Sequence, residues 1–246
     1  MAKPRLLITR FEPHAQILSD LLNENGIYSV AQPLLQIKPV VATEKPLYKV
    51  YDFIIAISCN AVIHTNYNLR GIEWPKSNYL AVGEATKLLL QKHTGQPVTV
   101  PVTTFNSEGL LALPCLQKLD NCSVLILRGA GGREYLKQHL CHRGASVDYY
   151  ESYQRVAIDL PTKRMSQKWQ QQAINGAIIS SVELLEQLIK VTLKEQQDWL
   201  KSITLFAASE RIINYAHDLG FYRTALLPGI ANQDIIDYFT NEGRYE

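Results

Sequence analysis

Short apolar runs recur along the 246-residue chain, and each is followed by a segment whose apolar residues stand three or four positions apart. The pattern is clearest between Ser123 and Gly144. Ser-Val-Leu-Ile-Leu is followed there by Arg-Gly-Ala-Gly-Gly-Arg-Glu, and helical spacing then continues through Leu136 and Leu140. An apolar run predicts a buried strand, and apolar residues at helical spacing predict one face of a helix. This stretch is therefore predicted to form a strand, a tight turn and a helix.

The same alternation predicts the remaining elements. Strands are expected at 5–9, 51–57, 79–82, 98–102, 177–179 and 204–207, and extended chain at 28–31 and 146–153. Helices are expected after Ser58 and Gly83 and at 13–25, 109–119, 182–190, 211–219 and 232–240. Strands that alternate with helices predict an α/β fold with parallel sheets, because a parallel pair of strands needs a crossover connection.

The second half of the chain repeats the first. An offset of 118 residues, from Arg10 to Arg128, superposes the strands before them, and the same offset aligns the helix stops Gly26 and Gly144. Two later pairs follow at similar offsets, and each joins a strand to a helix start. They are 53–62 with 175–184 and 80–84 with 206–210. The chain is therefore predicted to be an internal duplication of a unit of roughly half its length.

Two extended segments, around 37–39 and 153–158, interrupt this pattern at corresponding places in the two halves. If they pair as antiparallel neighbours, the chain crosses over twice between two domains. Domain 1 is then expected to combine 1–36 with 159–246 and domain 2 to cover 40–152, and 37–39 and 153–158 are expected to form a two-stranded extended linker. The length agrees with this division, because two domains of about 120 residues each have the usual domain size.

Composition narrows the function classes. Hydrophobic residues make up 46% of the chain and charged residues 20%, as in soluble globular proteins, and a net charge of +2 is too small to indicate nucleic acid or a membrane surface. No apolar run approaches the ~18 residues of a membrane span, and no secretory signal core follows Met1. We expect a cytoplasmic protein that binds a small molecule, and a monomer, because the duplication already supplies two lobes.

The spacing of cysteine and histidine does not indicate a metal site. The four cysteines show no Cys-x-x-Cys spacing. His139 and His142 share a helix face, but no third ligand is evident. The cysteines are therefore expected to be reduced, and no metal is expected.

The predicted strands end in small, hydroxylic or basic residues, with a helix just behind. Open parallel sheets bind ligands at the carboxyl ends of their strands, and the free N–H groups and dipole of a helix start favour anions. The candidate binding residues at these ends are Arg10, Ser58, Asn60, Gly83, Thr86, Arg128, Gly129, Gly131, Arg133, Ser180, Ser181 and Ser209. Several such ends facing one cleft suit a ligand with many carboxylates or phosphates, whereas each serine taken singly is better explained as a helix cap.

The glycine-rich turn from Arg128 to Glu134 matches no standard phosphate loop. A dinucleotide fingerprint needs a third glycine where Glu134 stands, and a Walker loop ends in Gly-Lys-Ser or Gly-Lys-Thr. The chain also lacks the Gly-x-Ser-x-Gly elbow of a nucleophilic serine. Catalysis is therefore expected to depend on binding, geometry and one proton donor. Tyr153 is the best candidate for that donor, and the alternative is that it only packs.

Short motifs occur in a consistent order along nearly the whole chain. They are Leu-Ile-Thr-Arg (7–10), Ile-Ser-Cys-Asn-Ala-Val (57–62), Ala-Val-Gly-Glu-Ala-Thr (81–86), Asn-Ser-Glu-Gly-Leu-Leu (106–111), Ile-Leu-Arg-Gly-Ala-Gly-Gly-Arg-Glu-Tyr-Leu (126–136), Arg-Gly-Ala-Ser-Val (143–147) and Tyr-Gln-Arg (153–155). Together they resemble the uroporphyrinogen-III synthase family. The resemblance implies two α/β domains joined by a two-stranded linker, and a cyclising lyase of haem biosynthesis.

The resemblance also implies a reaction. Hydroxymethylbilane loses its hydroxyl, ring D is attacked at its substituted α carbon to give a spiro intermediate, and the macrocycle closes to uroporphyrinogen III with ring D inverted. No cofactor or metal takes part, and hydroxymethylbilane synthase is the expected partner in a transient hand-over of the linear tetrapyrrole. Tyr153 would assist loss of the hydroxyl. Carboxylates would be held by the backbone around Ser58, Gly83, Gly129, Ser180 and Ser209, with Arg10, Arg128 and Arg133 as charge partners.

Two alternatives of other classes remain open from the residues alone. The first is a non-catalytic two-domain protein that binds a polyanionic metabolite or nucleotide. The second is a nucleotide-sugar transferase, which would need a strongly charged donor site that the sequence does not show. Binding of nucleotides compared with binding of the bilane separates these alternatives from the synthase.

Overall fold

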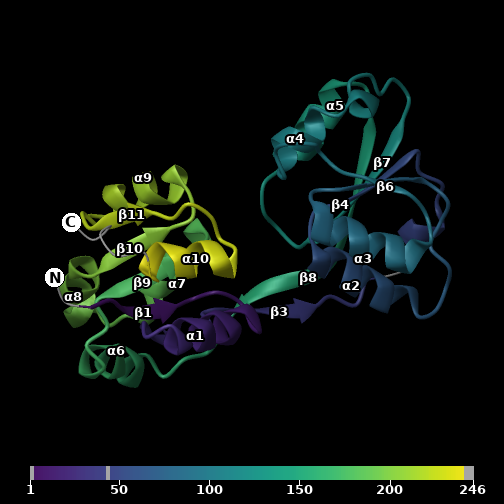
Figure 1. The fold of residues 1–246 in the computed structure, drawn as a ribbon. Coiled ribbons are helices and arrows are strands. Elements are labelled where there is room, and N and C mark those ends of the chain that lie inside the picture. The colour runs from purple at the N-terminus through teal and green to yellow at the C-terminus, as the bar shows by residue number, and fades with distance from the viewer. Residues whose placement is uncertain (1–2, 43–44, 241–246) are drawn as a thin grey trace. The chain divides into compact units, whose positions relative to one another are not determined.

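The computed structural model describes residues 3–42 and 45–240 (Figure 1). The chain divides into two compact units. Unit 1 combines Met1–Gln36 with Val156–Glu246, and unit 2 is Ile37–Arg155. Within the described ranges, no helix is both long enough and apolar enough to cross a membrane.

Unit 1 contains a parallel sheet with the strand order β11-β10-β9-β1-β2. Its strands are β1 (Arg5–Ile8), β2 (Tyr28–Ala31), β9 (Gly176–Ile179), β10 (Thr204–Ala207) and β11 (Thr224–Leu226). Its helices are α1 (His14–Glu24), α6 (Thr162–Gln171), α7 (Val182–Val191), α8 (Gln197–Ser202), α9 (Glu210–Asp218) and α10 (Asn232–Thr240), with a 3-10 turn at Lys194–Gln196.

Helices cover both faces of this sheet. Leu7 packs with residues of α7 and α9 in one buried cluster, whereas Leu6 and Ile8 pack with residues of α1 and α10 in another. Successive side chains of a strand point to opposite faces, so an uninterrupted apolar run requires apolar cover on both. The apolar runs that predicted buried strands therefore also account for the three layers.

Unit 2 has the strand order β3-β8-β7-β4-β5-β6. Its strands are β3 (Leu35–Pro39), β4 (Phe53–Ala56), β5 (Asn78–Ala81), β6 (Val98–Thr99), β7 (Ser123–Gly129) and β8 (Ser146–Ala157). Its helices are α2 (Cys59–Leu69), α3 (Glu84–Thr94), α4 (Ser107–Leu111) and α5 (Tyr135–His142), with 3-10 turns at Lys45–Tyr48 and Pro114–Leu116.

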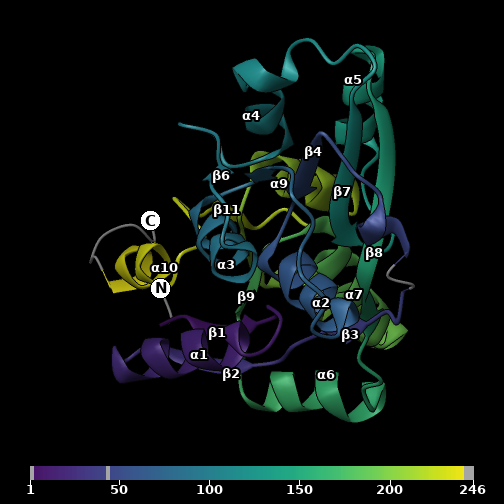
Figure 2. The same ribbon diagram turned by 90° about the vertical axis from the view of Figure 1, so that its right-hand side faces the viewer.

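This sheet is also covered on both faces. Ile54 and Ala56 of β4 pack with residues of α2 and α3, whereas Ile55 packs with residues of α4 and α5. Strands β5, β4, β7 and β8 run parallel, so their carboxyl ends emerge at one edge of the sheet. β7 and β8 lie side by side in both ribbon views (Figure 2). This edge positions the candidate site of unit 2.

Strands β3 and β8 are neighbours and carry the chain between the units. Val40 N donates to Ser152 O over 2.9 Å, and Ile158 N donates to Leu34 O over 3.0 Å. As the residue number rises from 34 to 40 in the first segment, the number of its hydrogen-bond partner falls from 158 to 152 in the second. The two segments are therefore antiparallel. The unit boundaries fall next to residue 37 and between 155 and 156, beside or within the segments for which a linker is predicted.

The main elements follow the sequence pattern, and the α/β fold with parallel sheets is confirmed. One predicted helix is wrong: 109–119 is interrupted, because α4 ends at Leu111 and a 3-10 turn begins at Pro114. Proline has no N–H to donate and its ring clashes with the preceding turn. Two α-helices and one strand within the described residues were not predicted. They are α6 and α8, which are mostly polar, and β11, a short strand at the edge of its sheet.

Candidate functional site

Four of the predicted site residues form a row across the sheet of unit 2. Ala56 of β4 pairs with Ala81 of β5 and with Leu127 of β7. Ser58, Gly83 and Gly129 each lie two residues beyond one of these partners. Tyr153 pairs with Gly129 and extends the row to β8. The sheet register therefore brings Ser58, Gly83, Gly129 and Tyr153 to the same level at the edge where the parallel strands end.

A bulge in β8 places Tyr153 in this row. Arg128 pairs with Glu151, but the next residue, Gly129, pairs with Tyr153, so Ser152 is the extra residue. Ser152 is fully buried, and its Oγ donates to Ala61 O over 3.2 Å. A bulge reorients the side chains that follow it, because the side-chain period of a strand is two. The bulge thus sets the face to which the Tyr153 ring points.

The Tyr153 ring packs directly against the backbone of Gly129. A Cβ on residue 129 would lie 2.7 Å from two ring carbons of Tyr153, closer than any real side chain allows. The tyrosine is buried, with 7% of its surface exposed. Its ring centroid is 5.8 Å from that of His64, and burial lowers the pKa of His64 and so favours its neutral form. Gly129 is therefore required for the close approach of the ring.

Ser58 joins Tyr153 to the start of α2. Its Oγ accepts from Ala61 N over 3.1 Å, which caps the helix, and lies 3.1 Å from the Tyr153 hydroxyl. Either hydroxyl can donate to the other. When Ser58 donates, the phenolic proton of Tyr153 is free for a ligand. The arrangement therefore forms a hydroxyl pair at a helix N-terminus that can release one proton and stabilise the resulting negative charge.

The neighbouring candidates at this edge occupy the starts of α2 and α3. Thr86 is buried, and its Oγ1 lies 3.6 Å from the sulfur of Cys59. Gly83 is the N-cap of α3 and has no side chain, so it offers the first N–H groups of that helix no side-chain acceptor. Asn60 is half-buried in the first turn of α2. Both helix starts can therefore present amides to an anion.

Arg128 is engaged within the glycine-rich turn. The residue is 3% exposed, its guanidinium donates to Gly129 O over 3.1 Å, and it pairs with Glu134 at 3.1 Å and with Glu151 at 3.8 Å. Its guanidinium also lies 4.3 Å from the centre of the Tyr149 ring. Arg128 therefore holds the turn together, and its role as a charge partner for a ligand remains a prediction.

The other residues of the turn differ in exposure. Gly131 N donates to a carboxylate oxygen of Glu151 over 3.3 Å, so this amide already has an anionic partner. Arg133 is exposed. A hydrogen bond from Tyr149 and the nearby charge of Arg128 lower the pKa of Glu134. The turn thus balances its own charges, which sequence spacing could not reveal because Glu151 and Tyr149 come from the next strand.

Four further candidates gather at the corresponding edge of unit 1. Ile178 of β9 pairs with Ile8 of β1 and with Phe206 of β10. Arg10 and Ser180 lie two residues beyond the first pair, and Ser181 and Ser209 follow in the next row.

Their contacts differ. Ser181 caps α7 by accepting from Leu184 N over 3.2 Å, whereas Ser209 occupies the N-cap of α9 without such a bond. Arg10 donates to Asn232 Oδ1 over 2.9 Å, and burial lowers the pKa of Arg10. The candidates therefore form two groups, one in each unit.

Sequence reasoning did not find the side chains that support the group of candidates in unit 2. Ser152, Glu151 and His64 all act on the row through contacts that depend on register, packing or the bulge. Across residues 3–42 and 45–240, no three His, Cys, Asp or Glu side chains are grouped closely enough to bind a metal ion.

Proteins of one known family align with most of this chain. A family model described as uroporphyrinogen-III synthase HemD matches residues 16–228. The uroporphyrinogen-III synthase of Salmonella typhimurium is 32% identical over 225 residues, which cover 88% of this chain and 92% of the relative. That of Proteus mirabilis is 35% identical over 192 residues, which cover 75% and 96%.

Solved structures give the same fold. The chain matches a mutant uroporphyrinogen III synthase of Thermus thermophilus with a TM-score of 0.66 at 14% identity, over 96% of this chain and 97% of the other. It matches the uroporphyrinogen-III synthetase of Helicobacter pylori with a TM-score of 0.58 at 15% identity, over 95% and 97%. The family model and the curated relatives together cover most of the chain, and on that ground it belongs to the uroporphyrinogen-III synthase family of cyclising lyases.

Proposed function

We propose that this chain converts hydroxymethylbilane into uroporphyrinogen III in haem biosynthesis, with loss of water and inversion of ring D through a spiro intermediate. Family membership supports the reaction. The observation that carries the assignment of a site is the Ser58–Tyr153 hydroxyl pair in the row at the edge of unit 2. The reaction begins with departure of a hydroxyl group, which is a poor leaving group unless it receives a proton.

Tyr153 is the proposed donor of that proton. As the carbon–oxygen bond breaks, the bonding electrons leave with the oxygen, the phenolic proton joins it, and water departs. The pyrrole nitrogen supplies the electron pair that forms the protonated azafulvene, which keeps its N–H until after ring closure. The tyrosinate left behind accepts a hydrogen bond from Ser58 Oγ, which lies 3.1 Å away beside the positive end of α2. A proton lost from the substrate after ring closure restores the phenol.

The substrate carboxylates are proposed to bind to helix starts and to cationic side chains. In unit 2 these are the amides around Ser58, Asn60, Gly83 and Thr86, the turn containing Gly129 and Gly131, and the side chains of Arg128 and Arg133. In unit 1 they are Arg10, Ser180, Ser181 and Ser209. Each helix start contributes ~0.3–1 kcal/mol to binding of an anion, so several together account for affinity without a large net charge.

Finer aspects of the function belong to the same proposal. The enzyme acts as a monomer in the cytoplasm, and receives its substrate by transient hand-over from hydroxymethylbilane synthase. The small net charge of +2 supports a partner that is neither nucleic acid nor a membrane surface. Hand-over is favoured because hydroxymethylbilane left in water closes without inversion of ring D.

The isomer of the product tests the proposal. Purified protein is supplied with hydroxymethylbilane made in situ, and the oxidised products are separated by chromatography. The type III isomer is expected to dominate, because the enzyme must direct closure through the substituted carbon of ring D. Type I product alone, at the rate seen without protein, contradicts the proposal and favours a non-catalytic binding protein.

A further inference from the structure

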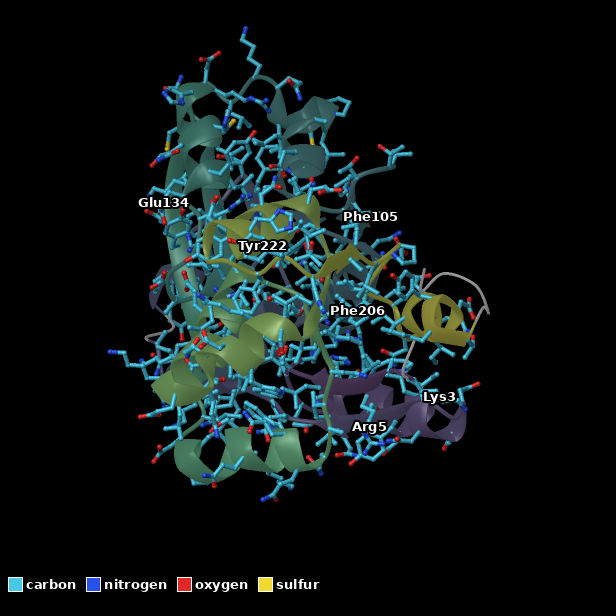
Figure 3. The ribbon with its side chains drawn as sticks, turned by 90° about the vertical axis from the view of Figure 1, so that its left-hand side faces the viewer. Lys3, Arg5, Phe105, Glu134, Phe206 and Tyr222 are labelled. Carbon is cyan, nitrogen blue, oxygen red and sulfur yellow. The ribbon has the colours of Figure 1, made fainter. Side chains whose placement is uncertain are left out.

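Phe105 is a large apolar side chain that the fold leaves in solvent. Its exposed fraction is 58%. Figure 3 labels its side chain. Single exposed hydrophobic residues are common on protein surfaces and need no explanation by themselves. Phe105 differs from such residues in its position and in the way its backbone is fixed.

Phe105 lies at the edge of unit 2 that carries the candidate site. It belongs to the loop that joins β6 to α4, and β6 pairs with β5 through Tyr79–Val98 and Leu80–Thr99. The chain segments that leave β5 and β6 therefore emerge at the same edge. A Cβ on Gly83 would lie 3.5 Å from Phe105 Cβ and 3.8 Å from its ring. Phe105 thus stands directly beside the start of α3, next to the row that contains Tyr153.

The backbone on either side of Phe105 is anchored. Asn106 N donates to Thr104 O over 3.0 Å, and Asn106 Oδ1 accepts from Gly109 N over 2.9 Å as the N-cap of α4. Gly109 has no side chain because Thr104 O occupies the space that a Cβ would fill. The residues on either side of the ring are therefore held in place. Less conformational entropy is lost when a ligand packs against the ring.

We propose that the Phe105 ring packs against the face of one pyrrole ring of the bound tetrapyrrole. This inference rests on the proposed function and adds a binding residue to it. A pyrrole is flat and apolar on its faces, and its carboxylate side chains lie at its rim. An exposed aromatic ring beside a helix start complements both parts, because the ring accepts the face and the helix amides accept a carboxylate. Packing of this kind acts on substrate binding and leaves the proton transfer at Tyr153 unchanged.

The test compares substitutions of Phe105 in the full-length protein, using hydroxymethylbilane made in situ. Phe105→Ala is expected to raise KM about 3- to 10-fold with kcat within twofold of the unsubstituted protein, because aromatic packing contributes to binding. Phe105→Tyr and Phe105→Trp keep a ring and are expected to retain a normal KM. Titration with uroporphyrin III, followed by fluorescence anisotropy, should show the same order of affinities.

Tyr222→Ala is the matched control. Tyr222 is 84% exposed, and it precedes β11 at the amino end of that strand in unit 1 (Figure 3). Its removal is expected to leave KM unchanged. An unchanged KM in Phe105→Ala overturns the inference, as does an equal rise in Tyr222→Ala or a loss confined to kcat. If the unsubstituted protein makes only type I product, the proposed function itself fails, and that result is separate from any effect of Phe105.

Discussion

At the scale of single residues, the account depends on Gly129. Its missing side chain leaves room for the Tyr153 ring, whose carbons would lie 2.7 Å from a Cβ. Neither residue alone shows this dependence in the sequence. The motif around Gly129 predicts a tight turn, and the structure adds that the same glycine fixes the position of the catalytic candidate.

Gly129→Ala should displace the Tyr153 ring. Crowding in a packed interior costs about 1–3 kcal/mol, and we expect kcat to fall at least about tenfold because the hydroxyl pair with Ser58 is broken. Gly176→Ala is the control, since a Cβ there would lie 2.8 Å from the Phe206 ring within the sheet of unit 1. It should lower the melting temperature comparably with little loss of kcat. Equal kcat in the two variants would show that the ring position is unimportant.

His64, whose ring lies beside that of Tyr153, is expected to make the stability of the protein depend on pH. Burial lowers the pKa of His64 below its ordinary value of 6.5, so the unfolded chain binds this proton more readily than the folded protein does. His64 therefore favours folding fully above pH 6.5, and this contribution is lost as the pH falls below that value. Urea unfolding of the protein and of His64→Asn at pH 7.5 and 5.5 measures the difference. A free energy of unfolding that falls equally in both would contradict this role.

At the scale of elements, the sequence predicted strands better than it predicted their surroundings. The apolar runs found β1, β4, β5, β7, β9 and β10, because burial on both faces leaves a simple signal. The sequence pattern did not indicate α6, because Met165 and Trp169 are the only large apolar residues of that helix. The bulge at Ser152 was also invisible, since it depends on how β8 pairs with β7. The row of candidates could be placed at strand ends, but the supporting contacts could not.

The turn between β7 and α5 provides a test at this scale. Arg128→Gln removes a buried cation that holds Gly129 O, Glu134 and Glu151. We expect a loss of about 2 kcal/mol in the free energy of unfolding, below the range for fully buried pairs because both glutamates are about half exposed. The amide of Gly131 should exchange its hydrogen faster. Thermal unfolding and hydrogen exchange measure the two effects.

Lys118→Gln is the control for that substitution. Lys118 pairs with Asp120 at 4.0 Å, and both side chains are largely exposed. Its loss should change stability by less than about 0.5 kcal/mol. If Arg128→Gln behaves in the same way, Arg128 does not hold the turn, and a direct role in binding substrate becomes the better interpretation.

At the scale of the whole molecule, the two halves carry comparable strand ends. Ser58 caps the helix that follows β4, and Ser181 caps the helix that follows β9. Each serine side chain accepts a backbone N–H. In the part of the chain that the structure describes, a tyrosine hydroxyl is a second partner of Ser58 and not of Ser181. The duplication remains a prediction. Under it, this difference assigns the proposed proton donor to one half, while both halves are proposed to bind carboxylates. Repeated motifs indicate such a plan from sequence, whereas the Ser58–Tyr153 contact requires the fold.

Comparison of the products of the unsubstituted protein and of Tyr153→Phe tests the central claim most directly. Tyr153→Phe keeps the ring against Gly129 and removes only the hydroxyl that faces Ser58. With equal protein and substrate, the unsubstituted chain is predicted to form type III product. The variant should lose at least about 100-fold in rate, the usual contribution of a positioned acid, and yield mainly type I by spontaneous closure. Type III product formed by the variant at an unchanged rate would contradict the account.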